Sequence, residues 1–475
     1  MRSSFFTIYR TAATLLAALL LLTGCGSGEL PQNATPPEPH TPCHEPFTPT
    51  PLELEADETD YRTLAEAVFE SVNVADADDF TYEGYGAGIR LLAYIGEGGT
   101  VVLPDEIDGK PVVALCHDLF HDNTALTALY IPDSVSEIGE NLLTGCRSLQ
   151  LLRTPLLGAT AESNDGHLSY FFGGNTAIGT GFLVPATLDT VLLASSVKSI
   201  PDYAFYECSR LRMVFCDGTV ETVGKFAFYG CNQLHTVELG IGMDTPQSIG
   251  DFAFGNCTAL TSFSLAGSSL GDSVLFGCTG LSTLTMSGFG EDTPHLGALF
   301  GAETHMWNST YVPEGLERVT VLGGNIPDNA FYGCEHVKIV HLADTESIGS
   351  RAFYGCTALQ KIDLPASVTS VGDLAFAHCT TLASVTLSVS LTTLGIQAFM
   401  DCTNLTAITL PDSLTALPNS TFSGCCNLQA VTLGKNVASV GAQAFRNCSS
   451  LTAVTGGKSD MQIDSGNEPL ENCLK

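Results

Sequence analysis

The sequence predicts a solenoid of stacked coils, mainly β-strand with turns and short helical pieces between the strands. One observation is a unit of 23 residues: residues 352–374 read AFYGCTALQKIDLPASVTSVGDL, and 375–397 and 398–420 repeat the pattern. Two more are a cysteine at a fixed place in each unit and an apolar spacing typical of short strands. One unit cannot bury its own apolar face, but stacked units share one continuous core.

The cysteine position identifies twelve units in one register. An asparagine takes this position once, and we interpret all twelve residues as structural turn positions: Asn123, Cys146, Cys208, Cys231, Cys257, Cys278, Cys334, Cys356, Cys379, Cys402, Cys425 and Cys448. Longer units lie near 147–207 and 279–333, and Cys473 marks a truncated thirteenth unit. Cys116, Cys216 and Cys426 are out of register.

Within a unit, the Leu-x-x-Ile-x-Leu stretch predicts a short strand that ends at Leu364-Pro365, because proline cannot extend a ladder. The following SVTSVG predicts a second short strand or extended run, and AFYGC turns the chain back. We expect these side chains to point inward: Phe353, Leu359, Ile362, Leu364, Val368 and Val371. The phenylalanines at the place of Phe353 should form a buried aromatic file along the stack.

Asn123 suggests what the cysteine position requires. Asparagine and cysteine share small size and an ability to meet backbone groups of a buried turn, which must be satisfied. Disulfides between neighbouring coils are the alternative, since equivalent Cα atoms lie within reach. Parallel cysteine side chains would have to break the repeat geometry to pair, so we expect buried free thiols.

These units resemble leucine-rich repeats. The 23-residue form with Ala-Phe-x-x-Cys and Leu-Pro-x-Ser-Val is similar to the BspA-like class of bacterial surface proteins, over roughly residues 100–475. The resemblance implies a leucine-rich-repeat solenoid, a right-handed curved superhelix of about 12–13 coils. Residues 59–99 should form a short helix, with helical spacing of Leu64, Val68 and Val72, and an N-terminal capping segment.

The N-terminus resembles the lipoprotein signal peptide of bacteria. Two arginines precede a short apolar run that ends in Leu-Thr-Gly-Cys, so we expect residues 1–24 to be removed and Cys25 to take a lipid. An ordinary secretory signal is the alternative, and either implies export. The proline-rich residues 25–58 predict a disordered tether that holds the solenoid away from the membrane.

Charge excludes two classes of partner. The chain has 19 lysines and arginines against 51 aspartates and glutamates, a formal charge of −32. Such a chain offers no basic footprint for nucleic acid and is repelled by anionic lipid. We therefore expect contact with a membrane through the lipid anchor alone.

No motif for catalysis, cofactor or metal fits its context. Residues 267–271 read GSSLG, but Ser269 falls in a loop of the repeat rather than at a strand-to-helix turn. His117 and His121 lack the glutamate of a zinc protease, and Cys43-His44 offers too few ligands. We expect no enzyme activity, no cofactor and no metal.

The remaining candidates are strand residues that face outward, just before the last leucine of each strand. Tyr130, Arg153, Phe215 and Glu238 in this column are large and varied, whereas the last four positions are threonine. Tyrosine, arginine and phenylalanine are typical of protein hot spots, so we hypothesise a partner site here. The alternative is that long coils tolerate odd residues.

The family resemblance implies a monomeric, lipid-anchored surface protein that adheres to host or microbial surfaces by binding a protein. A glycan-binding or envelope-structural role is the alternative, although the sequence has a single tryptophan, Trp307.

Overall fold

The computed structural model describes residues 61–160, 166–240, 247–265, 268–291 and 293–464. The expected signal peptide, lipidated Cys25, tether and truncated unit at Cys473 lie outside these residues. Those four features stay predictions. Among the described residues, no helix is long and apolar enough to span a membrane.

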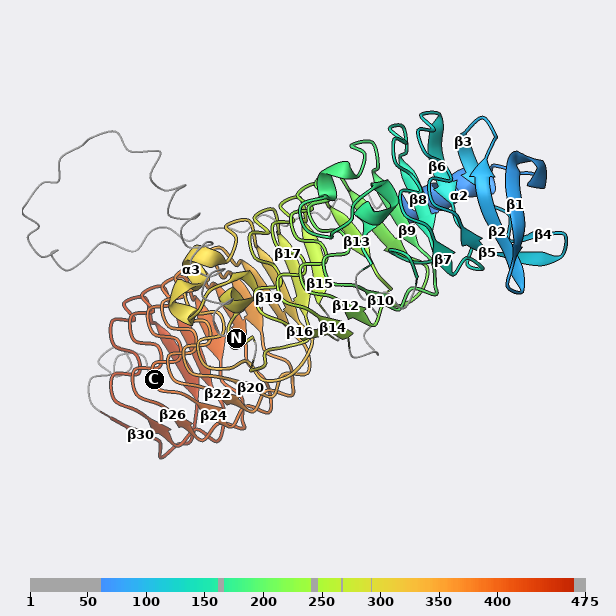
Figure 1. Ribbon diagram of the computed structural model, residues 1–475. Coiled ribbons are helices and arrows are strands. Elements are labelled where there is room, and N and C mark those ends of the chain that lie inside the picture. Colours follow the sequence, from blue (N-terminus) through green and yellow to red (C-terminus); the bar gives the residue numbers. More distant parts are fainter. Residues whose placement is uncertain (1–60, 161–165, 241–246, 266–267, 292, 465–475) are drawn as a thin grey trace, which may run out of the picture. The chain divides into compact units, whose positions relative to one another are not determined.

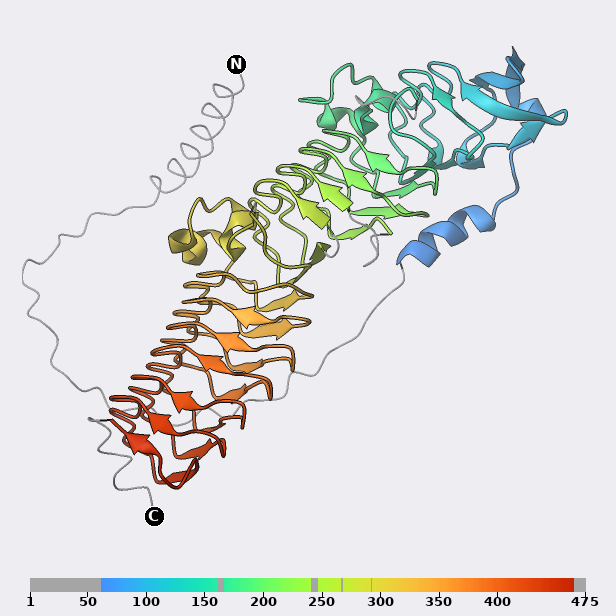
Figure 2. The same ribbon diagram turned by 90° about the horizontal axis from the view of Figure 1, so that it is seen from below.

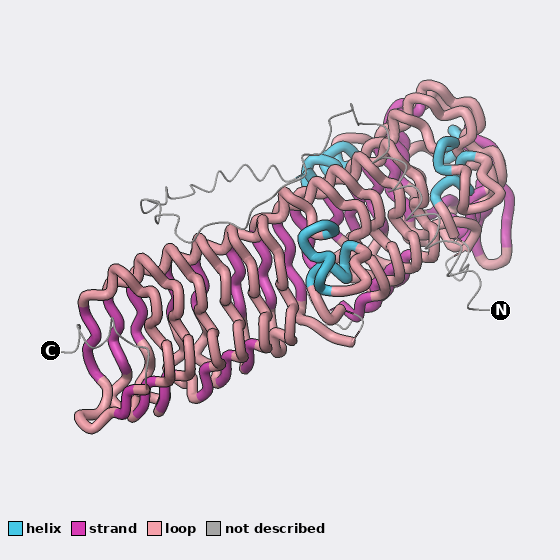
Figure 3. The backbone as a smooth tube through the Cα atoms, turned by 90° about the vertical axis from the view of Figure 1, so that its left-hand side faces the viewer, coloured by secondary structure: helices cyan, strands magenta, loops and turns pink. Residues whose placement is uncertain are grey.

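Each coil contributes one strand to a parallel row along one side of the stack (Figures 1 and 3). Hydrogen bonds join the described strands of this row into sheets of six, six and three. The strands are β3 (Gly99–Val102), β6 (Leu126–Tyr130), β8 (Leu151–Thr154), β9 (Thr190–Leu193), β11 (Met213–Cys216), β13 (Thr236–Glu238), β15 (Ser262–Leu265), β17 (Thr283–Met286), β18 (Arg318–Val321), β19 (Ile339–Leu342), β21 (Lys361–Asp363), β23 (Ser384–Thr386), β25 (Ala407–Thr409), β27 (Ala430–Leu433) and β29 (Ala453–Gly456).

A second row of strands, most of them shorter, follows the turn after the first strand in most coils. It comprises β5 (Lys110–Leu115), β7 (Glu137–Ile138), β10 (Ser199–Ile200), β12 (Thr222–Val223), β14 (Gln247–Ile249), β16 (Ser268–Leu270), β20 (Ser347–Ile348), β22 (Ser370–Val371), β24 (Thr393–Leu394), β26 (Ala416–Leu417), β28 (Ser439–Val440) and β30 (Gln462–Ile463). Ser269 lies in β16 and pairs with Ser248 of β14. The expectation of a loop there is wrong, because this coil continues the second row.

The solenoid fold is as the sequence predicts, but the coils outnumber the 12–13 expected, since the chain makes about 16 turns. Strands β3, β9 and β18 belong to coils that carry no cysteine or asparagine at the marker position. The first precedes the repeat series, and the other two arise within the two longer units. Counting cysteines therefore missed coils that keep the strand but replace the turn.

The core runs through the stack as files of equivalent residues. Phe331, Phe353, Phe376, Phe399 and Phe422 are each fully buried, and neighbouring rings in this file are stacked with centroids 4.8 to 5.6 Å apart. The expected inward residues of 352–374 are all buried as well. Stacked aromatic rings add to the free energy of burial, so this file couples each coil to the next.

The N-terminal part of the described chain first lies across the first coils as a helix and then forms the sheet that caps them. Helix α2 (Tyr61–Glu70) and the 3-10 helix η1 (Ala77–Asp79) lead into β1 (Phe80–Tyr85), which pairs antiparallel with β2 (Gly88–Tyr94). Strand β2 pairs with β5, and β4 (Glu106–Ile107) forms a hairpin with β5. This sheet closes the end of the core.

The two longer units contain insertions built to one plan. The first contains η2 (Leu168–Phe172) and η3 (Gly181–Leu183), and the second contains η4 (Leu296–Phe300), η5 (His305–Trp307) and α3 (Asn308–Tyr311). In each, a buried histidine precedes the first 3-10 helix and a left-handed glycine ends it. Both insertions leave their coils before the strand, on the same edge of the stack (Figure 2).

Candidate functional site

The first coils carry apolar side chains on the outward face of the strand row, where later coils, apart from Ile339 of β19, carry polar or small ones. In coil β21 the two outward residues, Lys361 and Asp363, are exposed. At the equivalent positions in the first coils, the outward residues form a small apolar cluster separate from the main core: Ala128, Leu151, Leu192 and Phe215, with Val102, Tyr130 and Met213 beside them. Apolar residues on this face need a cover, because exposed positions on a strand do not otherwise favour them.

Helix α2 is that cover. Phe69 is buried within the cluster, and its ring meets Tyr130 edge to face with centroids 5.4 Å apart. Ala65, one turn earlier, packs on the same cluster. After the helix, the backbone N–H of Ala75 donates to the carbonyl of Val102 at 2.9 Å, which ties the chain to β3. Figures 1 and 2 show α2 beside the first coils.

The four predicted partner-binding residues lie in this region, but two of them are not exposed. Phe215 is 1% exposed and Arg153 is 6% exposed, so the expectation of an open surface is wrong for both. Tyr130 is half-buried at the rim of the helix, and Glu238 is exposed beyond it. The sequence pattern located the unusual part of the strand face, and α2 explains the burial.

Arg153 is held from several sides. Its Nη1 donates to the carbonyl of Ile131 at 2.9 Å and lies 2.6 Å from Oδ1 of Asp133. Its Nη2 lies 3.3 Å from Oδ2 of Asp217, and its guanidinium carbon lies 4.4 Å from the ring centroid of Tyr130. A buried guanidinium needs such partners, and the cation–π contact adds to them. The side chain is therefore fixed in place.

Asp217 joins the solenoid to the helix. While Oδ2 contacts Arg153, Oδ1 lies 3.3 Å from Nη2 of Arg62 on α2. Glu66 accepts from Nε of the same Arg62 at 2.9 Å, one helical turn away. Arg62, Ala65 and Phe69 thus form the docked face of α2, whereas Leu64 and Val68 are exposed at 58% and 38%.

Sequence reasoning missed the docked face of α2. The spacing of Leu64, Val68 and Val72 predicts a helix but marks its exposed side. The signal that was present is the run of apolar residues at outward strand positions, because such a run requires another segment of the chain to cover it.

The cysteine file makes a repeated structural contact. In nine coils the thiol donates to the carbonyl of the core phenylalanine in the preceding coil, at 3.0 or 3.1 Å: Cys146, Cys231, Cys257, Cys278, Cys356, Cys379, Cys402, Cys425 and Cys448. At the equivalent place, Oδ1 of Asn123 accepts from the backbone N–H groups of Ala125 and Leu126 at 3.1 Å. Both residue types satisfy backbone groups of a buried turn.

The cysteines of the file are free thiols. Burial raises the pKa of Cys146 to about 11 and of Cys208 and Cys278 to about 12. A reactive thiol needs a lowered pKa and access to solvent, and these three thiols have neither. Of the cysteines outside the register, Cys116 and Cys216 are free and Cys426 is disulfide-bonded.

One buried pair resembles a catalytic dyad. Nδ1 of His167 lies 2.7 Å from Oγ of Ser169, which is also 2.7 Å from Oγ1 of Thr180. In the second insertion, Nδ1 of His295 lies 2.9 Å from Oδ1 of Asn308. Gly297 stands there in the place of Ser169. What the two histidines share is a hydrogen bond to another residue of their own insertion.

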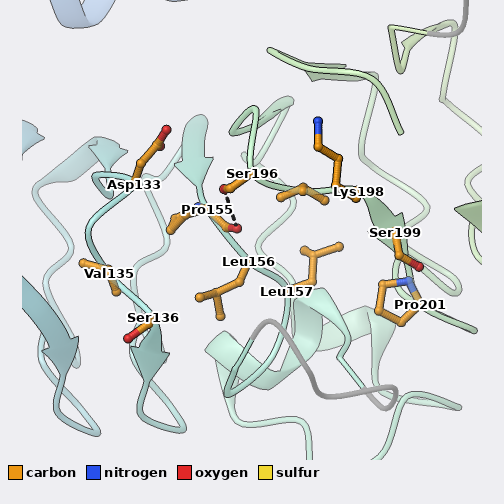
Figure 4. A pocket seen from close by; sticks show the side chains of 11 residues that line it. Asp133, Val135, Ser136, Pro155, Leu156, Leu157, Ser196, Lys198, Ser199 and Pro201 are labelled. Atoms are coloured by element: carbon orange, nitrogen blue, oxygen red, sulfur yellow. Dashed lines mark hydrogen bonds between the residues drawn. The ribbon is translucent and has the colours of Figure 1, made fainter. Parts of the chain in front are cut away.

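A hollow of about 310 Å³ lies between the coils of β7, β8 and β10 (Figure 4). Its lining residues are Asp133, Val135, Ser136, Pro155, Leu156, Leu157, Ser196, Val197, Lys198, Ser199 and Pro201. Oγ of Ser196 donates to the carbonyl of Pro155 at 3.4 Å. The lining contains no histidine beside its serines. Within the described part of the chain, no group of three His, Cys, Asp or Glu side chains is arranged to hold a metal ion.

Comparison with known proteins identifies the family of the repeats. The model of the BspA type leucine rich repeat region matches residues 111–161, 176–291 and 324–452. Among solved structures, a leucine-rich repeat protein from Bacteroides ovatus is 22% identical over 82% of this chain and 99% of that one, with a TM-score of 0.33. A leucine rich cell surface protein from Faecalibacterium prausnitzii is 16% identical over 85% and 97%, with a TM-score of 0.23.

The pneumococcal vaccine antigen PcpA is 16% identical over 85% of this chain and 95% of that one, with a TM-score of 0.25. The comparison with curated proteins found no match. The family model covers more than half of the sequence, and most of the described coils have a short strand followed by a buried turn with phenylalanine and cysteine. The chain therefore belongs to the BspA-type leucine-rich-repeat family.

Proposed function

We propose that this chain is an exported, lipid-anchored cell-surface protein that adheres by binding a protein ligand on the strand face of its first coils. The observation that carries the proposal is Tyr130, half-buried at the rim of α2, whose ring lies 4.4 Å from the guanidinium carbon of an Arg153 that Asp133 and Asp217 fix in place. Aromatic residues and arginine held in a desolvated setting dominate the binding energy of protein interfaces.

Export and anchoring rest on the N-terminal sequence, with Cys25 after Leu-Thr-Gly. Related repeat proteins include one described as a cell surface protein, which agrees with this location. Labelling with an alkyne fatty acid should mark the wild-type protein and leave the Cys25→Ser variant unlabelled. Equal labelling of the two would contradict lipidation at this residue.

The binding test compares two ends of the same outward column. Tyr130→Ala with Glu238→Ala should weaken binding to a captured matrix protein by at least 10-fold, about 1.4 kcal/mol. The matched control, Thr409→Ala with Thr432→Ala, alters exposed residues of later coils and should bind as wild type does. The assignment of the site would be refuted if both variants bind as wild type does, or if only the control loses binding.

A glycan ligand is the second candidate, favoured by aromatic rings on a different surface. Tyr203 stacks on Phe226 with centroids 5.3 Å apart, Tyr206 stacks on Tyr229 at 5.5 Å, and all four are half-buried. Tyrosine offers a sugar both ring surface for its C–H groups and a hydroxyl for hydrogen bonding. Binding on a glycan array that Tyr206→Ala abolishes and Tyr130→Ala leaves intact would favour this function over the first.

A further inference from the structure

The strand face of the first coils already holds one ligand, because α2 is packed on it. The helix contributes one buried aromatic residue, Phe69, one small residue, Ala65, and one ion pair from Arg62 to Asp217. The main core does not include this helix or the cluster beneath it. A helix of 10 residues is marginal by itself in water, so α2 owes its docking to these few contacts.

We propose that this face is a helix-binding site with α2 as its built-in occupant, and that its external partner is a protein helix that competes with α2. The proposal deepens the proposed function, since it names the kind of protein ligand. The site sets the chemistry of that helix: an aromatic residue for the apolar cluster and an arginine for Asp217. In α2 these residues are Phe69 and Arg62, seven positions apart.

Seven positions are two helical turns, so both side chains lie on one face, about 10 Å apart along the axis. The site has a matching length. Tyr130 lies on β6 and Asp217 directly follows β11, three strands further along the sheet, or about 14 Å at 4.8 Å per strand. The length of the arginine side chain covers the difference. Ala65 between them is small, which lets the helix approach the sheet.

Two features make α2 displaceable rather than a fixed part of the fold. Its opposite side presents Leu64 and Val68 to solvent, so none of the described segments packs on that side. Its contacts are few compared with those of any coil, and segments with few buried apolar contacts open at low free energy. The tethered helix competes at an effective concentration of about 1 mM, which a partner must overcome.

The test uses the full-length chain and a labelled peptide of residues 59–72, TDYRTLAEAVFESV. In the double variant Arg62→Ala with Phe69→Ala, α2 should leave the face, and hydrogen exchange of residues 61–75 should rise at least 10-fold. The peptide should then bind the variant at least 10-fold more tightly than it binds wild type, measured by fluorescence anisotropy. Leu64→Ala is the matched control, because Leu64 is exposed on the same helix and its loss should change neither reading.

A peptide lacking the aromatic residue tests the chemistry, and the peptide with Phe69→Ala should bind neither protein. Three results would overturn the proposal: no release of α2 in the double variant, no peptide binding after release, or equal binding to wild type and variant. Circular dichroism and thermal melting confirm that each variant is folded. If the peptide binds but no matrix protein does, the proposed adhesion is refuted and the helix site stands. If a matrix protein binds but the peptide does not, the helix site is refuted and the proposed adhesion stands.

Discussion

Replacing Phe376 with alanine tests the aromatic file as the coupling between coils. The side chain is fully buried, and its ring stacks on Phe353 at 5.0 Å and on Phe399 at 5.2 Å, with interplanar angles of 4°. Truncating a buried phenylalanine costs about 3–5 kcal/mol, including the cavity. Since two stacked pairs are lost at once, we expect a value at the upper end, about 4–5 kcal/mol.

The assay is urea unfolding followed by circular dichroism at 25 °C. Phe376→Leu keeps most of the volume but loses both stacked pairs, so about 1–2 kcal/mol is expected. Thr409→Ala, on the exposed column, should stay within about 0.5 kcal/mol of wild type. An alanine variant that costs less than about 2 kcal/mol, or a leucine variant as costly as alanine, would show that the rings do not couple the coils.

Two more predictions concern the cysteine file and the insertions. Burial raises the pKa of Cys208 and Cys278 to about 12, against about 8.5 in the unfolded chain. Unfolding above pH 9 therefore releases protons, so the unfolding free energy should fall as the pH rises from about 9 to 12. Urea midpoints at pH 8 and pH 10 measure this fall, which Cys278→Ala should lessen; identical midpoints would contradict buried thiols. Gly297→Ala should cost about 2 kcal/mol, because a Cβ there would lie 2.4 Å from Oδ1 of Asn308 and displace a buried hydrogen-bonding group. Gly297→Ser with Asn308→Thr copies the first insertion and should recover stability in thermal melts, whereas equal losses in the single and double variants would refute the shared plan.

The sequence predicted the regular part of the fold because each coil repeats its local physics. The marker cysteines, the inward residues around Phe353 and the proline-ended strand at Leu364 all follow from one 23-residue pattern. Each inward position has equivalent neighbours in the regular coils, so the pattern determines which side chains form the core.

The site was only partly predictable, since its cover comes from outside the repeat. Phe215 and Arg153 stood out as odd residues, but their burial depends on α2, whose docking joins Arg62 to Asp217 across 155 residues. No periodicity encodes a contact of that kind. The number of coils was underestimated for a related reason, because the coils of β9 and β18 lost the marker cysteine when insertions replaced their turns.

The thiol-to-carbonyl contact has a consequence for how this chain can vary. Each of these cysteines contacts the coil before it, so a whole unit gained or lost between β19 and β29 can keep the same thiol-to-carbonyl contact. Within the described residues, the cluster that α2 covers lies on the coils from β3 to β11. The number of later coils therefore sets the length of the stack independently of the face that α2 covers, so spacing and recognition are free to evolve separately.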